Sequence, residues 1–425
     1  MSSLHDRIYD YEGPPRVCHE GHVYYEADVI REQYALPSVD ERERTVAAVD
    51  DQLEVLVSGG SMGGLFSAVA LRQAGHDVTV FERTERGKMK ERGAGIVAHP
   101  EMLTYLERQG IASWDEITTS TNRIHHLGRD GSPVDTEGRA IYTSSWDTVY
   151  RAMRAALPDD DYRMGKQTTA VSQTDDGVTL TFADGETATG DLLVVAEGYR
   201  SPTREQFLPE RQPTYAGYAA YRGTVAEADV VDDYPKQFSD IYNLYHAPES
   251  QFLTYPVPGP NGEMARGERR INWVWYSRFE EGEELDDLLY DNEGRQRSHS
   301  LPPGLMREEV RERQLALADD ILPPQMAWLV RQTADPFVQC IYDLTLPKLV
   351  FGRACILGDA AFFIRPHMAA GTAHAVADAL ELAESLHTSD GLEPALDSWE
   401  RGQVEMGYRL VEEARRRGDR YVGKF

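Results

Sequence analysis

The first recognisable pattern in the chain is an apolar run, then a glycine-rich turn, then an apolar stretch with helical spacing. Residues 53–58 (LEVLVS) form the run, four glycines fall within 59–64, and the apolar residues of 65–71 recur as on one helix face. Residues 77–82 (DVTVFE) form a second short apolar run. A strand, a helix and a second strand in this order predict one β-α-β unit.

Strands of the same kind recur later in the chain. Residues 191–196 (DLLVVA) and 353–357 (RACIL) are apolar without alternation, as expected for strands buried on both faces. The second of these precedes a helical pattern over 371–386. Residues 178–182 alternate and lead into Asp184-Gly185, a dipeptide typical of hairpin turns.

Residues 205–349 have a different character. Aromatic residues alternate along 271–276 (INWVWY), and proline and glycine turns are frequent, which predicts antiparallel strands. We therefore expect an α/β protein, in which a Rossmann-like nucleotide-binding domain is interleaved with an antiparallel β-sheet substrate domain. The predicted parts are an N-terminal arm at 1–50, the first part of the nucleotide-binding domain at 51–204, the substrate domain at 205–349, and the second part with C-terminal helices at 350–425. The arm would pack on the body or on a second subunit, so a homodimer is possible.

Composition narrows the partners. The 425 residues are 41% hydrophobic and carry 71 acidic and 44 basic side chains, a formal net charge of −27. Such a field repels nucleic acid and anionic lipid surfaces, so neither is expected as a partner. No apolar run approaches the roughly 18 residues that a membrane span needs, and the N-terminus does not resemble a signal peptide. We expect a cytoplasmic location.

Only six of the 44 basic residues are lysines. An acidic surface poor in lysine is typical of halophilic proteins, in which salt screens the self-repulsion. An ordinary acidic cytosolic protein is the alternative. The three cysteines disfavour a disulfide framework. Cys18, His19 and His22 could be imagined as metal ligands, but no second cluster supports them, and we expect no metal site.

The turn at 59–64 (GGSMGG) carries the first candidate chemistry. A dinucleotide fingerprint places Gly-x-Gly-x-x-Gly between a strand and its helix, so that a pyrophosphate can approach the backbone closely. Ser61 stands here in place of the second glycine, which makes the motif imperfect. Glu82 ends the second strand, where a carboxylate can accept hydrogen bonds from ribose hydroxyls. The alternative is a plain tight turn with Glu82 at the surface.

A second constellation joins residues 358–361 (GDAA) to 365–371 (RPHMAAG), again between a buried strand and a helix. Asp359, at the strand end, could hold a polyol chain. The helix start is built of small residues and would direct N–H groups at an anion. A flavin needs both features, because its ribityl chain is a polyol and its reduced ring carries negative charge. A capping or turn residue is the plainer interpretation of Asp359 alone.

These two motifs, in this order and about 300 residues apart, resemble the class A flavoprotein monooxygenases, the para-hydroxybenzoate hydroxylase family. The resemblance covers roughly residues 52–415. The stretches that carry it are 59–64 (GGSMGG), 93–97 (GAGIV), 213–218 (PTYAGY), 222–223 (RG), 255–259 (YPVPG) and 365–367 (RPH).

The resemblance implies a Rossmann-like FAD-binding domain, with the glycine turn on the pyrophosphate, Glu82 on the adenosine ribose and Asp359 on the ribityl chain. The implied cofactor-binding residues are Gly59, Gly60, Ser61, Met62, Gly64, Glu82, Arg83, Gly95, Glu197, Gly198, Gly358, Asp359, Pro366, Ala370 and Gly371. Two positions depart from the family pattern. Glu197 stands where the family has Asp, and Tyr150 stands where the family often has an FAD-contacting Arg, with Arg151 and Arg154 nearby.

The implied activity is hydroxylation of a small aromatic or heteroaromatic substrate, such as a phenol or a hydroxypyridine. NADH or NADPH would reduce the FAD, and O2 would form a C4a-hydroperoxide that transfers OH to the ring. Two alternatives share the fold: an FAD-dependent reductase of an alkene or prenyl substrate, and a flavin-binding protein without turnover.

The substrate side is less defined by the sequence. His367 is the first candidate for a catalytic base, because its motif puts it near the flavin and an ordinary histidine pKa suits that task. Tyr221 and His246 are the next candidates, and Tyr255, Trp273 and Trp275 could line the pocket. Along 271–276, Asn272, Val274 and Tyr276 share one strand face and the two tryptophans the other, so at most one set can face the substrate.

Overall fold

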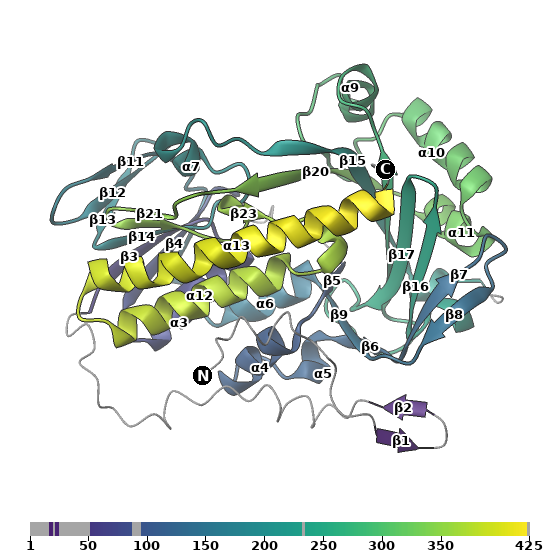
Figure 1. Ribbon diagram of the computed structural model, residues 1–425, viewed down its shortest axis with the longest axis horizontal. Coiled ribbons are helices and arrows are strands. Elements are labelled where there is room, and N and C mark those ends of the chain that lie inside the picture. Colours follow the sequence, from purple (N-terminus) through teal and green to yellow (C-terminus); the bar gives the residue numbers. More distant parts are fainter. Residues whose placement is uncertain (1–16, 20–21, 25–51, 87–94, 232–233, 423–425) are drawn as a thin grey trace.

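The computed structural model describes residues 17–19, 22–24, 52–86, 95–231 and 234–422 (Figure 1). Two short antiparallel strands, β1 (Val17–His19) and β2 (His22–Tyr24), belong to the expected N-terminal arm. The rest of the arm lies outside the described residues. So do the side chains of Cys18, His19 and His22, on which a metal site was considered.

A six-stranded sheet forms the centre of the nucleotide-binding half. Its strand order is β10-β4-β3-β14-β22-β21, and every pair is parallel except β22–β21. The carboxyl ends of the parallel strands therefore meet at one edge of the sheet. The strands are β3 (Glu54–Ser58), β4 (Asp77–Glu82), β10 (Tyr162–Met164), β14 (Leu192–Val195), β21 (Val350–Phe351) and β22 (Ala354–Ile356).

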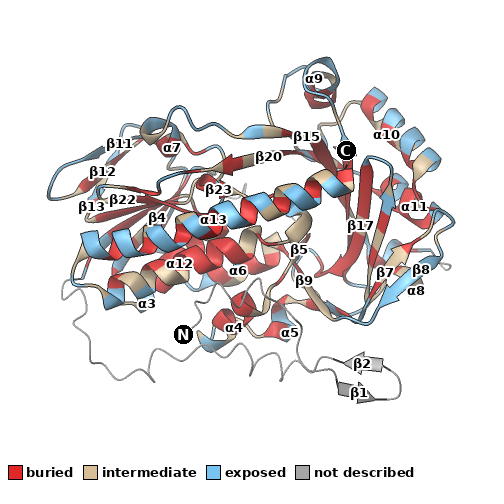
Figure 2. Ribbon diagram, viewed as in Figure 1, coloured by how far each residue is buried: buried red, intermediate tan, exposed pale blue. Residues whose placement is uncertain are grey.

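Helices and a small sheet bury this central sheet. Helix α12 packs along α3, and α13 packs along α12 (Figures 1 and 2). A three-stranded antiparallel sheet contributes buried residues to the same core. The elements are α3 (Met62–Gln73), α4 (Pro100–Arg108), α5 (Trp114–Ile117), α6 (Trp146–Ala155), α7 (Pro202–Phe207), α12 (Gly371–Thr388), α13 (Leu392–Val422), β11 (Thr168–Gln173), β12 (Val178–Phe182) and β13 (Thr187–Gly190).

The second half is built on a large sheet of order β19-β20-β15-β18-β17-β16-β7-β8, with β23 paired to β20. The expected antiparallel sheet needs one correction, because β16 and β7 are parallel. Strands β7 and β8 also precede residue 205. The strands are β7 (Arg123–Leu127), β8 (Pro133–Glu137), β15 (Thr214–Ala226), β16 (Ile241–Ala247), β17 (Ser250–Val257), β18 (Arg270–Arg278), β19 (Ser300–Leu301), β20 (Phe337–Thr345) and β23 (Phe362–Phe363).

One face of the large sheet is covered by its own helices. Trp273 and Trp275 are fully buried there, and the indole N–H groups donate to Thr333 Oγ1 (2.8 Å) and Ser250 Oγ (2.7 Å). The other face is turned towards α13 and the nucleotide-binding half. The remaining elements are α8 (Pro235–Phe238), α9 (Glu283–Leu289), α10 (Glu308–Ile321), α11 (Pro324–Gln332), β5 (Gly95–Val97), β6 (Thr119–Thr121) and β9 (Ile141–Ser145).

Two negative findings apply to the part of the chain that the structure describes. None of its helices combines the length and the apolar character that crossing a bilayer requires. It also contains no group of three or more His, Cys, Asp or Glu side chains arranged to hold a metal ion.

A buried ion pair stabilises the large sheet. Arg269 donates to both carboxylate oxygens of Glu227 (2.9 and 2.6 Å), and Ser239 Oγ and the Gly267 N–H donate to the same carboxylate. Burial alone would raise the pKa of Glu227. These hydrogen bonds and the Arg269 charge outweigh it and lower the pKa to about 2. The ionised carboxylate therefore stabilises the folded state above the unfolded pKa near 4.5, and this contribution is lost as pH falls towards 2.

We predict that Glu227→Gln lowers the free energy of unfolding by about 3 kcal/mol at pH 7, a value that follows from the pKa shift. Denaturant titrations at several pH values would measure it. The difference from the parent should shrink as pH falls below about 4.5, because the parent then loses the same charge. Glu413→Gln, which removes two ion pairs on the surface of a helix, is the control. A loss of stability that is the same at low pH and at pH 7 would contradict this account.

Candidate active site

The glycine turn packs against itself and its neighbours more closely than residues with a Cβ would allow. Gly59 has φ +107°, in the region that favours glycine. A Cβ on Gly60 would lie 2.2 Å from the Tyr162 hydroxyl oxygen, and a Cβ on Gly64 would lie 1.8 Å from the Gly59 carbonyl oxygen. Ser61 is the N-cap residue of α3, and its side chain makes no capping hydrogen bond. The departure at Ser61 therefore leaves the turn intact.

Glu82 and Tyr162 fix the conformation of this turn. Glu82 ends β4 and is 5% exposed, and it accepts hydrogen bonds from the N–H groups of Gly60 and Thr84 (both 2.8 Å). The Tyr162 hydroxyl donates to the Gly60 carbonyl (2.8 Å). Sequence reasoning missed Tyr162, because it reaches the turn from β10 across the sheet and belongs to no local motif.

Tyr150 departs from the family pattern, and it and the nearby Arg151 and Arg154 all contact other residues of the protein. Tyr150 lies 3.1 Å, hydroxyl to hydroxyl, from Tyr162. Arg151 donates to Asp147 and to the Pro260 carbonyl, whereas Arg154 donates to Asp159 and stacks over the Tyr162 ring. A tyrosine at position 150 therefore supports the glycine turn through Tyr162. Arg83, next to Glu82, is exposed at the strand end.

The Glu197 carboxylate accepts hydrogen bonds from neighbouring protein groups. The donors are the hydroxyls of Ser58 (2.6 Å), Ser201 (2.5 Å) and Thr203 (2.9 Å), and the Thr203 N–H (3.1 Å). These bonds join the end of β3 to the start of α7, beside Gly198, which has φ +76°. Four protein donors occupy this carboxylate, so the longer Glu side chain is used to hold the turn.

Asp359 lies at the carboxyl end of β22, in the turn that leads to α12. Gly358 has φ +60°, and its N–H donates to the buried Asp378 carboxylate (2.8 Å). The Asp359 side chain is exposed and has no hydrogen-bond partner in the described part of the chain. The protein around it still desolvates it, and this effect, followed by the charge of Asp378, raises the pKa of Asp359 to about 6. An accessible carboxylate in such surroundings suits a polyol ligand.

The two helix starts at this edge are suited to anions. Neither α3 nor α12 has an acidic residue in its first turn, although the chain carries 71 acidic residues. Ala370 is the N-cap residue of α12, Gly371 is its first residue, and Pro366 is exposed in the preceding turn. Ala369 has φ +55°, and its carbonyl lies 3.0 Å from His99 Nε2. His99 thus ties the segment that begins at Gly95 to the loop before α12.

His367 is hydrogen-bonded at both ring nitrogens. Nδ1 lies 3.0 Å from Gln251 Oε1, an acceptor, so Nδ1 carries the proton and Nε2 accepts from the Tyr218 hydroxyl (2.8 Å). Burial, followed by the charges of Arg365 and His246, lowers the pKa of His367 to about 3. The sequence hypothesis assumed an ordinary histidine pKa for His367, and the buried position of the ring contradicts that assumption. The ring is neutral near pH 7.

The other two catalytic candidates lie in different places. Tyr221 is buried on the tryptophan face of the large sheet, against Trp275 and Phe279, on the opposite side from His367. His246 is exposed on β16, and its Nε2 accepts from Gln251 Nε2 (2.9 Å). His246 and His367 are therefore linked through Gln251, whereas Tyr221 is separated from both by the sheet.

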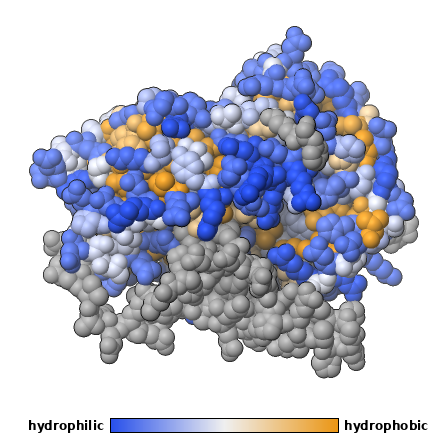
Figure 3. Space-filling view, viewed as in Figure 1, coloured by the Kyte–Doolittle hydropathy of each residue, from blue (hydrophilic) through white to orange (hydrophobic). Residues whose placement is uncertain are grey.

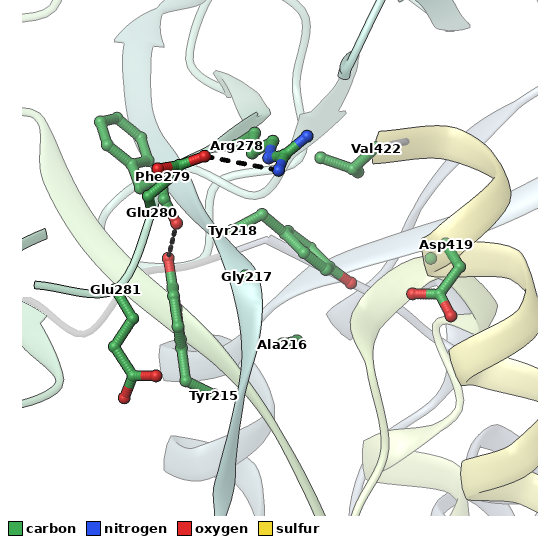
Figure 4. Close-up of a pocket in the computed structure, with 11 residues that line it drawn as sticks. Tyr215, Ala216, Gly217, Tyr218, Arg278, Phe279, Glu280, Glu281, Asp419 and Val422 are labelled. Carbon is green, nitrogen blue, oxygen red and sulfur yellow. Dashed lines mark hydrogen bonds and ion pairs between the residues drawn. The ribbon is translucent and has the colours of Figure 1, made fainter. Parts of the chain in front are cut away.

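A cavity of about 270 Å³ lies behind Tyr218, between β15, the end of β18 and the last turns of α13 (Figure 4). The Tyr218 side chain runs towards Asp419, and its hydroxyl is the one that His367 accepts from. Glu280 and Glu281 line the cavity at the sheet end. His367, in the loop that precedes α12, is therefore hydrogen-bonded to a residue that lines this cavity.

The Asn272 face of the large sheet meets the nucleotide-binding half. Asn272 Oδ1 accepts from the Gly95 N–H (3.0 Å), and Arg222 Nη2 donates to the Gly95 carbonyl (3.0 Å). Through His99, the same segment reaches the Ala369 carbonyl in the loop before α12. Of the two strand faces that the sequence left open, the Asn272 face therefore contacts the nucleotide-binding half. Arg222 appeared in the sequence only within a motif, without a role.

Known proteins share this sequence and architecture. Residues 215–343 match a family model described as "FAD binding domain-like". Over 371 residues the chain is 32% identical to 2,6-dihydroxypyridine 3-monooxygenase of Paenarthrobacter nicotinovorans, a match covering 86% of this chain and 91% of that protein. It is 27% identical to 6-hydroxynicotinate 3-monooxygenase of Pseudomonas fluorescens, over 78% of this chain and 82% of the relative. The solved structure of 2,6-dihydroxypyridine-3-hydroxylase from Arthrobacter nicotinovorans matches with a TM-score of 0.82 and 30% identity, over 88% of this chain and 94% of that chain.

The chain belongs to the class A FAD-dependent aromatic monooxygenases. This confirms the family that the sequence motifs indicated, with FAD as cofactor and NAD(P)H and O2 as cosubstrates. It also favours a monooxygenase over the two alternatives, the alkene or prenyl reductase and the flavin-binding protein without turnover.

The described residues of this monooxygenase fit FAD. The glycine turn leads directly into the N-terminus of α3, and Asp359 is accessible at the neighbouring strand end. Two helix N-termini without acidic residues face the same edge, as a pyrophosphate and a flavin ring require. Each carboxylate oxygen of Glu82 accepts one hydrogen bond from a backbone N–H, which leaves each oxygen a further lone pair for a ribose hydroxyl.

We predict that Asp359→Ala weakens FAD retention by the monooxygenase, because a carboxylate that accepts from ribityl hydroxyls is lost. Charge-assisted hydrogen bonds of this kind contribute on the order of 1.5–3 kcal/mol, so the Kd for FAD should rise about 10- to 100-fold. Flavin fluorescence quenching on titration with protein measures it. Asp390→Ala, an exposed carboxylate after the far end of α12, is the matched control. An unchanged Kd in the Asp359 variant would remove Asp359 from the site.

Proposed function

We propose that this enzyme hydroxylates a small, electron-rich hydroxylated aromatic ring, with a hydroxypyridine as the preferred class. The observation that carries the proposal is the match over 91% of a relative named for 2,6-dihydroxypyridine, joined by a second relative named for 6-hydroxynicotinate. Both names describe hydroxylated pyridine rings. The Asn272 face, with its tyrosines and amide, is chemically suited to a flat ring that carries hydroxyl groups.

When bound, FAD would supply the redox chemistry: NAD(P)H reduces the flavin, and the reduced flavin activates O2. The protein binds the cofactor through the glycine turn, Glu82 and Asp359, and orients the ring on the Asn272 face. His367 would act by position, because its neutral ring fixes the Tyr218 hydroxyl and the Gln251 amide. Burial raises the pKa of the Tyr255 hydroxyl to about 12, and it lowers the pKa of His367. Neither Tyr255 nor His367 therefore titrates near neutrality.

We predict that 2,6-dihydroxypyridine or 6-hydroxynicotinate accelerates NAD(P)H oxidation by the FAD-loaded enzyme, with stoichiometric O2 uptake. An oxygen electrode and absorbance at the nicotinamide band would follow both rates, with NADH and NADPH tested separately and phenols as a comparison series. If hydroxylated rings accelerate neither rate, the proposed substrate class is wrong. Acceleration of NAD(P)H oxidation without O2 uptake would point to the reductase alternative.

We predict that His367→Ala retains FAD but slows hydroxylation about 10- to 100-fold, since misplacing a substrate by roughly 1 Å has effects of that size. Peroxide released per NAD(P)H consumed should rise, because a misplaced ring lets activated oxygen escape. His246→Ala, at the exposed end of the same hydrogen-bond chain, should have a smaller effect. Loss of FAD in the His367 variant would make the residue structural, and unchanged rate and coupling would leave it no role.

We also propose that the acidic surface is a salt adaptation of a cytoplasmic enzyme. The net charge is −27, and hydrophilic residues cover much of the face viewed in Figure 3. Screening by salt would relieve repulsion among the excess carboxylates, so we predict that the Tm rises from dilute buffer to molar salt. Differential scanning calorimetry in NaCl and KCl would measure the change. A Tm that stays flat or falls over this range would exclude the adaptation.

A further inference from the structure

Asp378 and His374 form a buried pair on α12 that the proposed chemistry does not use. Each is 1% exposed, and they lie one helical turn apart. The His374 Nδ1 atom lies 3.4 Å from Asp378 Oδ1. Asp378 Oδ1 and both ring nitrogens of His374 have no hydrogen-bond partner in the described part of the chain. Buried polar atoms without partners are uncommon in folded proteins, so this pair needs a physical explanation.

The Asp378 side chain joins α12 to the turn that carries Asp359. Its Oδ2 atom accepts a hydrogen bond from the Gly358 N–H (2.8 Å), and the Asp378 carbonyl accepts from the Trp399 indole N–H of α13 (3.0 Å). Gly358 has φ +60°, and Asp359 follows it directly after β22. The position of Asp378 therefore determines where the Gly358 N–H, and with it the Asp359 side chain, lies relative to the start of α12.

The surroundings of Asp378 supply no compensating positive charge. Helix α12 packs against α3, α4, α13 and the turn at Gly358–Ala360, and the buried residues of α3 and α13 include no charged side chain. Among the residues that the structure places, His374 is the ion-pair partner of Asp378, and no Lys or Arg pairs with it. The acidic groups on these neighbouring elements and on α12 itself are Asp359, Cys355, Glu381 and Glu101.

Burial in these surroundings disfavours a charge on either member of the pair. It raises the pKa of Asp378 to about 7 and lowers the pKa of His374 to about 4. Below pH 7 the pair therefore holds its proton on the carboxyl group, and the imidazole is neutral. A protonated Oδ1 can donate to His374 Nδ1, which gives both of these atoms a partner. The other oxygen, Oδ2, still accepts from the Gly358 N–H.

The charge of Asp378 matters to Asp359, because both carboxyl groups flank the same turn. Burial and then the charge of Asp378 raise the pKa of Asp359 to about 6. An ionised Asp378 would also oppose an anionic ligand at the start of α12, where the helix N-terminus favours negative charge. A neutral Asp378 removes this repulsion and keeps the hydrogen bond to Gly358.

We propose that Asp378 positions the Gly358–Asp359 turn for FAD, and that it does so as a neutral carboxylic acid that shares its proton with His374. Ionisation of Asp378 then weakens FAD binding. Asp378 is a positioning residue, because it acts on FAD through Gly358 and Asp359. The inference extends the assignment of Asp359 to the ribityl chain, and it does not depend on which aromatic substrate the enzyme takes.

The test measures the Kd for FAD by flavin fluorescence quenching between about pH 5.5 and about pH 9. The proteins compared are the parent, Asp378→Asn, Asp378→Ala, Glu381→Gln and Asp390→Asn, and thermal unfolding checks that each one folds. Asparagine has the shape of the neutral acid: its amide oxygen can accept from the Gly358 N–H, and its amide N–H can donate to His374. Glu381→Gln removes a neighbouring carboxyl group on α12, and Asp390→Asn removes an exposed one after the end of this helix.

For the parent, we expect the Kd for FAD to rise about 10-fold from about pH 6.5 to about pH 8.5, which corresponds to roughly 1.4 kcal/mol of repulsion. The direction follows from the raised pKa of Asp378, since its neutral form is lost as pH rises through about 7. Asp378→Asn should keep the tighter binding and lose the rise. Asp378→Ala should bind FAD weakly over the whole range, because the Gly358 N–H loses its acceptor. Glu381→Gln and Asp390→Asn should keep the rise.

Infrared absorption examines the pair without FAD. A C=O band of a protonated carboxylic acid should be present in the parent near neutral pH and absent from Asp378→Asn. His374→Phe should move this band, because the acid loses the acceptor of its proton. A parent without the band would contradict the neutral acid, and a band that does not move in the His374 variant would contradict the shared proton.

Three results of the FAD titrations would overturn the proposal. A rise that persists in Asp378→Asn would mean that another group causes it, and its loss in Glu381→Gln would assign it to Glu381. Weak binding by Asp378→Asn at every pH would mean that FAD requires the ionised carboxylate. A parent Kd that does not rise above pH 7 would mean that the charge of Asp378 does not act on FAD. No step uses an aromatic substrate, so failure to hydroxylate hydroxypyridines would count against the proposed function alone.

Discussion

The structure depends on the close approach of backbone at the turn between β3 and α3. Gly59, Gly60 and Gly64 let the turn touch the Ala196 carbonyl after β14, the Tyr162 hydroxyl and itself at distances that exclude a Cβ. Glu82 and Tyr162 then lock the turn from the neighbouring strands. Because the strands are parallel, the same sheet edge also receives Asp359 from the far end of the chain. The close approach at the turn and the parallel strands together bring the two motifs that we propose to bind FAD to one sheet edge.

The large sheet adds the second half of the site by separating its two faces. The tryptophan face is filled by α10 and α11 and serves stability. The Asn272 face keeps polar side chains, of which Arg222 and Asn272 retain unpaired donors. Buried polar groups without partners destabilise a fold. We therefore interpret the unpaired donors of Arg222 and Asn272, where the large sheet meets the nucleotide-binding half, as functional. The hydrogen-bond chain from Tyr218 through His367 and Gln251 to His246 runs along the same face.

Local patterns predicted much of this arrangement. The glycine turn, the strand ending at Glu82 and the turn at Asp359 each follow from a few consecutive residues, because close approach and strand ends leave signatures in short stretches. Contacts between distant segments left none. Tyr162 reaches the glycine turn across the sheet, and Arg222 meets Gly95 from 127 positions away. Strands β7 and β8 join the large sheet from before residue 205, through a parallel pairing that no local pattern encodes. The motif placed His367 near the flavin, and this stays a prediction. Its pKa is lowered by burial and by the charges of Arg365 and His246, which only the fold brings together.

The central claim is that one edge of the parallel sheet and the Asn272 face of the large sheet form a single site for FAD and an aromatic ring. A crystal structure of the FAD-loaded enzyme with 2,6-dihydroxypyridine would test it most directly. The account predicts the pyrophosphate at the start of α3, the ribityl chain at Asp359, and the pyridine ring between the flavin and the Asn272 face. A flavin bound away from Asp359, or a ring on the tryptophan face or in the cavity behind Tyr218, would contradict it.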